Sequence, residues 1–151
     1  MANIDLSYKN AGSIGLPAFE TLDTYSQSNL TAGAEPAREQ PVRILLASST
    51  TLAKYQVVGL DAANHLVAAT YNATPANAIK PIGVLEHPSA SGATNTTVYG
   101  EVVLTGVYNV GDDDGGTGSP LVWDASFTTA ALKMASVIGN ALLIFRRRKV
   151  I

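Results

Sequence analysis

Hydrophobic and polar residues follow two different patterns along the chain, with a change near residue 41. Residues 1–40 are dominated by small and polar residues, and their apolar residues are spaced singly, apart from a short helix expected after Pro17. Such a stretch buries too little apolar surface to repay the entropy of ordering it. We therefore expect an extended N-terminal arm over residues 1–40, ordered by a partner surface or a neighbouring copy.

Residues 41–151 show short apolar runs bounded by turn residues, which predicts a mainly β body. In the sequence DAAN, Asp61 favours the start of a turn and Asn64 tolerates a left-handed backbone, so the flanking runs form a β-hairpin. Residues 96–110 alternate, with Val98, Gly100 and Val102 on one face. Strands are expected at residues 42–47, 54–60, 65–71, 79–87, 96–110 and 141–151, the last with a charged second half.

Residues 125–138 contain the best helical pattern of the chain. Asp124 or Ser126 is expected as the N-cap, alanines fill the middle, and Gly139 follows where a helix would stop. The expected fold is thus mainly β with a minor α component: a compact sandwich-like or barrel-like body, one or two short helices, and the extended arm.

The composition is poor in charge, which favours a surface covered by partners. Charged residues make up 15% of the chain, against about 25% in ordinary soluble domains. The absence of cysteine excludes disulfides, thiolate metal ligands and a cysteine nucleophile. No apolar run is long enough for a membrane span, and the N-terminal residues do not resemble a signal peptide. We therefore expect a product made in the cytoplasm, without a membrane partner.

The basic residues are concentrated at the C-terminal end. Arg146, Arg147, Arg148 and Lys149 are four of the ten basic residues, so the rest of the chain has six basic and twelve acidic residues. An acidic body repels phosphate, and only Phe145 supplies an adjacent aromatic ring, so we expect no direct nucleic-acid partner. The basic end suits a protected edge strand or a contact with an acidic neighbour.

The sequence GDDDGGTG at residues 111–118 raises the question of a cation or phosphate site. It lacks the ligand spacing of an EF-hand, the aspartate of a calcium-binding repeat and the lysine of a phosphate-binding loop. Adjacent carboxylates also alternate in direction. We interpret Asp112, Asp113 and Asp114 as a solvated turn that contributes little to stability, with an adventitious cation site as the alternative.

Candidate catalytic residues are few. His65 and His87 lie next to predicted turns, and no serine motif accompanies them. Glu86 and Glu101 would face each other across paired strands as an acid–base couple, but two exposed strand carboxylates give the same pattern. The residues therefore favour a protein that is not an enzyme, with a small hydrolase as a minor alternative.

Two segments resemble the head decoration proteins of lambdoid phages. IKPIGVLEHPSASGATNTTVYGEVVL (79–104) has a strand with glycine between hydrophobic residues, then a small-residue turn and a Thr-rich strand. SPLVWDASFTTAALKMASVIGNALLIF (119–145) has L-x-W at Leu121–Trp123, an Ala-Ser pair, an Ala-rich stretch and Gly139 before a closing apolar strand. The arm and the basic end are longer than is usual in that family, which leaves the details of attachment open.

This resemblance implies a structural virion protein on the exterior of an assembled phage capsid. It would bind the major capsid protein as homotrimers and stabilise the shell against internal DNA pressure, without turnover, cofactor or metal. Residues 3–9 alternate as a strand would, and strand addition to an exposed sheet edge would bury one apolar row. The expected capsid-contacting residues are Ile4, Leu6 and Tyr8, with Ile14, Leu16 and Phe19 as a second anchor. The alternative is a calcium-dependent or glycan-binding module of the virion surface.

Overall fold

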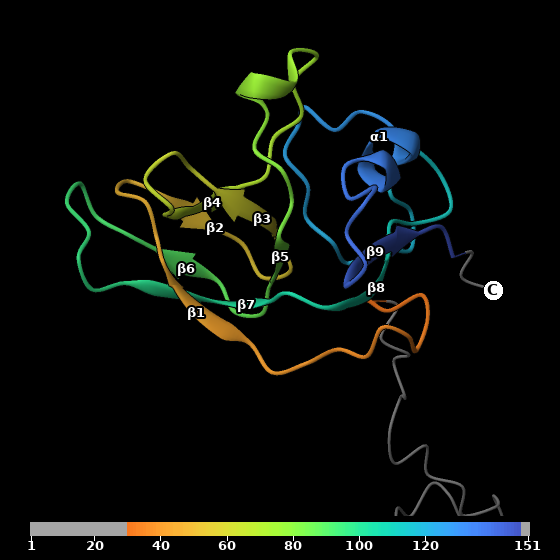
Figure 1. The fold of residues 1–151 in the computed structure, drawn as a ribbon, viewed down its shortest axis with the longest axis horizontal. Coiled ribbons are helices and arrows are strands. Elements are labelled where there is room, and N and C mark those ends of the chain that lie inside the picture. The colour runs from red at the N-terminus through yellow and green to blue at the C-terminus, as the bar shows by residue number, and fades with distance from the viewer. Residues whose placement is uncertain (1–29, 149–151) are drawn as a thin grey trace, which may run out of the picture.

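The computed structural model describes residues 30–148, which form a mainly β body with a single short α-helix, as the sequence predicts (Figure 1). The elements are β1 (Val42–Leu45), β2 (Thr51–Leu52), β3 (Val57–Leu60), β4 (Leu66–Ala68), the 3₁₀ turn η3 (Pro75–Asn77), β5 (Gly83–Leu85), β6 (Ser89–Ala90), β7 (Tyr99–Val103), β8 (Gly106–Asn109), α1 (Ala130–Ala135) and β9 (Leu143–Arg146).

The largest sheet curls until its first and last strands touch. Its five strands are antiparallel, in the order β1-β7-β5-β3-β4. Just beyond β1, Leu46 bridges to Leu66 in β4, and the Ala47 N–H donates to the Leu66 carbonyl at 3.0 Å. The two-stranded sheet β2-β6 lies beside it (Figure 1). The result is a small, partly closed β-body.

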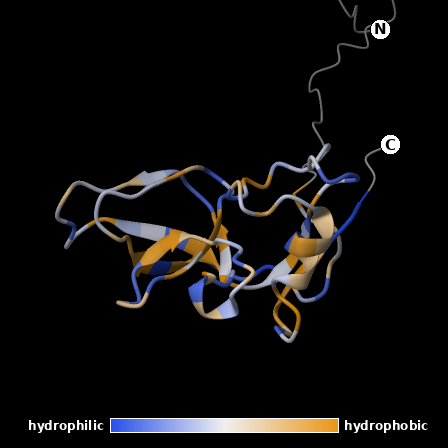
Figure 2. Cartoon of the chain, turned by 90° about the horizontal axis from the view of Figure 1, so that it is seen from above, coloured by the Kyte–Doolittle hydropathy of each residue, from blue (hydrophilic) through white to orange (hydrophobic). Residues whose placement is uncertain are grey.

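Alternating side chains of this sheet supply two separate hydrophobic clusters. In β3, Val58 packs inside the curled sheet and Val57 packs on its outside, because successive strand residues point to opposite faces. In β5, Leu85 likewise packs inside the curled sheet and Val84 packs on its outside. Figure 2 shows these strands as mostly hydrophobic. The inner cluster contains Leu46, Leu52, Val58, Leu66, Leu85 and Val102.

The outer cluster joins the curled sheet to a second layer made of α1, β8 and β9. β8 and β9 pair in parallel, and residues Leu30–Ala32 add antiparallel to the other edge of β8. Leu30, Tyr108, Phe127 and Leu143 are among the buried residues here. Within residues 30–148, the only helix is too short to cross a membrane.

The predicted β-hairpin is confirmed. β3 and β4 pair antiparallel around residues 61–64. The Asp61 carboxylate accepts hydrogen bonds from the N–H groups of Ala63 and His65, each at 2.8 Å. Asn64 adopts a left-handed backbone with φ of 62°. Local side-chain chemistry therefore specifies this turn.

The predicted helix over residues 125–138 is wrong in extent, because α1 begins only at Ala130. Asp124 does not cap it; its carboxylate accepts from the Ser126 N–H in a separate turn. The N-cap is Thr129, whose backbone is extended. Its hydroxyl oxygen accepts a hydrogen bond from the Leu132 N–H at 3.2 Å. Threonine competes for backbone hydrogen bonds and so favours a cap over a helix interior. The predicted stop at Gly139 is also wrong, because α1 ends at Ala135 with Ser136 as its C-cap, although Gly139 does adopt a positive φ of 92°.

Two other strand predictions need correction. Residues 96–110 form two strands, because the chain turns at Thr105 and at Gly106, whose φ is 123°. This break sends β7 into the curled sheet and β8 into the second layer. The small-residue turn expected within residues 79–104 contributes β6, which pairs with β2.

Gly83 provides a direct test of the close packing of this sheet. A Cβ on Gly83 would lie 2.5 Å from the Val103 carbonyl oxygen, inside the contact of β5 with β7. Because a strand backbone must shift to relieve this clash, Gly83→Ala should lower the free energy of unfolding by about 1–3 kcal/mol. Gly92→Ala is the matched control, since nothing lies within 4 Å of its Cβ. Equal urea midpoints for the two variants would contradict this packing.

Candidate functional site

The predicted capsid-contacting residues all lie outside residues 30–148, the part of the chain that the structure describes. This applies to Ile4, Leu6 and Tyr8, to the second anchor at Ile14, Leu16 and Phe19, and to the helix expected after Pro17. Their arrangement stays a prediction.

The point at which this segment joins the body is well defined. The Asn109 N–H donates to the Leu30 carbonyl, and the Ala32 N–H donates to the Val107 carbonyl, both at 2.9 Å. Leu30 is buried in the outer cluster. The sequence placed Leu30 in the arm because its neighbours in sequence are polar, but its apolar partners come from distant segments. Residues 30–32 therefore act as a short third strand beside β8.

The next residues of the expected arm also pack on the body. The buried Thr105 hydroxyl accepts from the Glu39 N–H and donates to the Ala37 carbonyl, at 2.8 and 2.9 Å. Arg38 forms an ion pair with Glu86 at 2.8 Å between Nη2 and Oε1. Residues 1–29 are thus attached through a segment held at several points.

The acidic loop is a turn, as expected, but its carboxylates are not merely solvated. Asp113 accepts two hydrogen bonds from Thr117, from the N–H at 2.9 Å and from the hydroxyl at 2.7 Å. These bonds, the one from the N–H first, lower the pKa of Asp113 below its usual value. Asp113 thus closes the loop on itself while it stays exposed to solvent, and the small contribution of the three aspartates to stability stays a prediction.

Asp114 connects the loop to two other elements. Its Oδ1 accepts from the Ala130 N–H at the start of α1 and from Arg147 Nη2, at 3.1 and 2.8 Å. Its carbonyl accepts from Lys133 Nζ at 3.3 Å. The basic end thus meets an acidic partner, which lies in the same chain. Sequence reasoning missed this network because its members are far apart along the chain.

Lys133 is an unusual residue of this network because its side chain is almost fully buried, with 5% exposed. Its ammonium group lies 5.8 Å from the centre of the Trp123 ring, in the range of a cation–π contact. Burial lowers the pKa of Lys133, and the charges of Asp114 and Asp113 partly offset this effect. Trp123 itself packs edge-on against Phe127 and Phe145.

A polar cavity of about 310 Å³ adjoins this lysine. Asp114, Asp124 and Trp123 line it together with Lys133. The Asp124 carboxylate already accepts from Ser126, and Lys133 donates to Asp114. No group of three or more potential metal ligands is found within residues 30–148. The two carboxylates that line the cavity thus already accept hydrogen bonds from the protein.

The histidines and the two strand glutamates have ordinary partners. His65 Nδ1 lies 3.8 Å from the Asp61 carboxylate in the hairpin turn. His87 Nε2 lies 3.9 Å from Glu101, and both side chains are exposed. Glu86 and Glu101 are neighbours, since the Glu86 N–H donates to the Glu101 carbonyl, but the Glu86 carboxylate pairs with Arg38. Each carboxylate thus faces a basic side chain and not the other glutamate.

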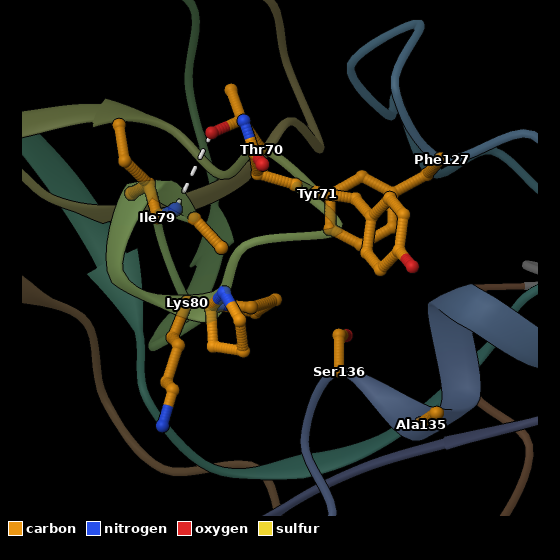
Figure 3. A pocket seen from close by; sticks show the side chains of 11 residues that line it. Thr70, Tyr71, Ile79, Lys80, Phe127, Ala135 and Ser136 are labelled. Atoms are coloured by element: carbon orange, nitrogen blue, oxygen red, sulfur yellow. Dashed lines mark hydrogen bonds between the residues drawn. The ribbon is translucent and has the colours of Figure 1, made fainter.

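An apolar pocket of about 190 Å³ lies between residues 70–81 and α1 (Figure 3). Tyr71 and Phe127 form one wall, with ring centres 6.2 Å apart. Ser136 lies across from them, and the amino group of Lys80 points away (Figure 3). An apolar side chain of a partner would fit this pocket. No local pattern in the sequence predicts this pocket, because its walls come from three separate segments.

No protein-family model matches the chain, and no curated protein matches it. The resemblance to lambdoid head decoration proteins therefore rests on residues 79–104 and 119–145. In the structure, the first segment contains β5, β6 and β7, and the second contains Trp123, α1 and most of β9. Both are parts of the hydrophobic body and not of the arm.

Replacing Asp114 should test its role in joining the loop, α1 and β9. Asp114→Ala removes the acceptor for Ala130 and Arg147, which should cost about 0.5–2 kcal/mol, as the loss of a helix cap does. Little of this comes from the exposed ion pair with Arg147. Glu39→Ala is the control, since its exposed side chain has no bond among the described residues. An unchanged melting temperature for Asp114→Ala would contradict this role.

The pKa of Asp113 predicts a pH dependence with a definite sign. Because its folded-state pKa is lowered, its contribution to stability is present above the unfolded pKa. It is lost as the pH falls through the folded pKa. NMR titration of the Asp113 carboxyl carbon should give a midpoint below that of an unfolded aspartate. Thr117→Val keeps the backbone N–H and removes only the hydroxyl, so it should move the midpoint part of the way upward. A midpoint that does not respond would exclude the Thr117 hydroxyl as a cause.

Proposed function

We propose that this protein is a structural virion protein, which binds the outside of an assembled phage capsid as trimers and stabilises the shell. The observation that supports this proposal best is the attachment of residues 1–29. Residues 30–32 are hydrogen-bonded to β8 and Leu30 is buried in the outer cluster, so the segment before them starts from a fixed place on the sheet. A tether of this kind suits a protein that acts by holding a partner.

The partner is the major capsid protein, and residues 3–9 supply the contact. Their alternating pattern presents Ile4, Leu6 and Tyr8 on one side and polar residues on the other. Strand addition to an exposed sheet edge satisfies the backbone and buries the apolar row. Ile14, Leu16 and Phe19 form a second anchor.

Two features of the body are consistent with a binding role. The mainly β fold agrees with the fold that the resemblance implies. Its surface is low in charge and exposes several large apolar side chains, among them Tyr71, Tyr99 and Ile138. Exposed apolar surface is typical of contacts with partners. These side chains offer contacts between copies in a trimer.

The alternative, a calcium-dependent or glycan-binding module, has less support. Calcium would need oxygen ligands from the acidic loop, but Asp113 already accepts from Thr117, and Asp114 accepts from Ala130 and Arg147. Calorimetry with calcium distinguishes the two proposals, because only the alternative predicts binding heat that disappears on replacement of these aspartates.

The proposal is tested by mixing the protein with expanded, undecorated shells of a lambdoid phage and measuring co-sedimentation. Full-length protein should bind in a fixed ratio to capsid subunits. Replacing Ile4, Leu6 and Tyr8 by serine should abolish binding, because the buried apolar row is lost. Replacing Asn3, Ser7 and Lys9 by alanine is the matched control and should leave most binding intact. Equal binding by both variants would contradict the role of the row, and no binding by the parent protein would contradict the proposed partner.

A further inference from the structure

The polar cavity beside Lys133 has no part in the proposed contact with the shell. Its volume of about 310 Å³ lies at the lower end of the range found for small-molecule sites, about 300–1,000 Å³. Three segments supply its walls: the acidic loop, residues 119–127 and α1. The cavity therefore has room for one small molecule.

Lys133 brings hydrogen-bond donors to this cavity. Only 5% of the residue is exposed, yet its ammonium group carries three N–H donors. One donates to the Asp114 carbonyl at 3.3 Å, and no other hydrogen bond within residues 30–148 engages the group. Its remaining contact is the cation–π contact with Trp123, which supplies no acceptor oxygen. Because a buried donor without an acceptor costs free energy, a ligand oxygen in the cavity would be bound favourably.

Asp114 and Asp124 bring hydrogen-bond acceptors to the same cavity. Oδ1 of Asp114 accepts from Ala130 and Arg147, and Oδ1 of Asp124 accepts from Ser126. In the part of the chain that the structure describes, no hydrogen bond engages the Oδ2 atom of either carboxylate. The cavity thus offers both donors and acceptors to a single ligand.

The charges that line the cavity favour a neutral ligand. Lys133 supplies a positive charge, whereas Asp114 and Asp124 supply negative charges. An anion would meet the carboxylates, and a cation would meet the ammonium group. A metal ion is disfavoured further, since residues 30–148 hold no group of three potential metal ligands. A neutral ligand avoids both repulsions and can use the donors and the acceptors together.

We propose that this cavity binds a neutral sugar ring. Each sugar hydroxyl both donates and accepts, so neighbouring hydroxyls can accept from Lys133 and donate to the two carboxylates. The C–H groups of the ring would pack on the apolar walls, which include Leu121, Trp123 and Phe127. A primary amide has the same kinds of polar atoms, but it is too small to contact these walls at the same time.

This site is separate from the proposed shell contact, because it lies on the body and not in residues 3–9. It also needs no calcium. The experiment below uses neither shells nor metal ions, so its result does not depend on the proposed function.

The single tryptophan of the chain, Trp123, lines the cavity, so its fluorescence reports on a ligand there. Full-length protein is titrated, in the presence of a chelator, with D-glucose, D-galactose and N-acetyl-D-glucosamine, and with acetamide as the matched control. At least one sugar should give a saturable change with a dissociation constant in the millimolar range, as expected for a ligand of this size. Acetamide should give none.

Two variants show whether the sugar occupies this cavity. Lys133→Met keeps the length of the side chain and removes its donors, so it should weaken binding about ten-fold. Lys80→Met is the matched control, since Lys80 is exposed and does not line the cavity. Ala125→Phe should abolish binding without disturbing the core, because Ala125 lines the cavity and is itself exposed.

Three results would overturn the proposal. The first is the absence of a saturable change with all three sugars. The second is an equal affinity of the parent protein and Ala125→Phe, which would place the sugar elsewhere. The third is a saturable response to acetamide alone, which would assign the cavity to an amide ligand such as a peptide group.

Discussion

The side-chain amide of Asn109 is fully buried, so each of its polar atoms needs a partner inside the protein. Its Oδ1 accepts from the N–H groups of Gly111 and Arg148, at 2.9 and 3.0 Å, and its Nδ2 donates to the Gly118 carbonyl at 3.3 Å. Its backbone N–H donates to Leu30. One residue therefore fixes both ends of the acidic loop, the end of β9 and the start of the described chain. Buried amides that lose one partner destabilise strongly, so these four segments depend on one another.

This arrangement makes β8 the structural link between the body and the segments proposed to act. β8 continues from β7, so it is anchored in the curled sheet at one end. It holds residues 30–32 on one edge and β9 on the other. Asp114 reinforces the same layer by joining α1 to Arg147. A pull on the segment before Leu30 would therefore be passed to the hydrophobic core and not to a loose loop, which is what the proposed shell-binding role would require.

Local features of the sequence predicted the local parts of this fold. The β3–β4 hairpin follows from Asp61 and Asn64, because both act within their own turn. The start of α1 was missed because Thr129 serves as a cap, which outweighs the apolar spacing of the preceding residues. The division of residues 96–110 into two strands depends on Gly106. Its positive φ lies where the chain passes from the curled sheet to the second layer, which the sequence alone does not show. The site features that join distant segments, such as Asp114 with Arg147, have no short-range signal in the sequence.

The central proposal is that residues 3–9 bind the capsid shell by strand addition and are attached to the body through β8. Its most direct test is a cryo-EM reconstruction of expanded shells saturated with the protein. The account predicts trimeric density on the outer surface, with residues 3–9 as a strand continuous with a sheet of the capsid subunit. Density inside the shell, or trimers whose N-terminal residues do not touch the capsid subunit, would contradict it.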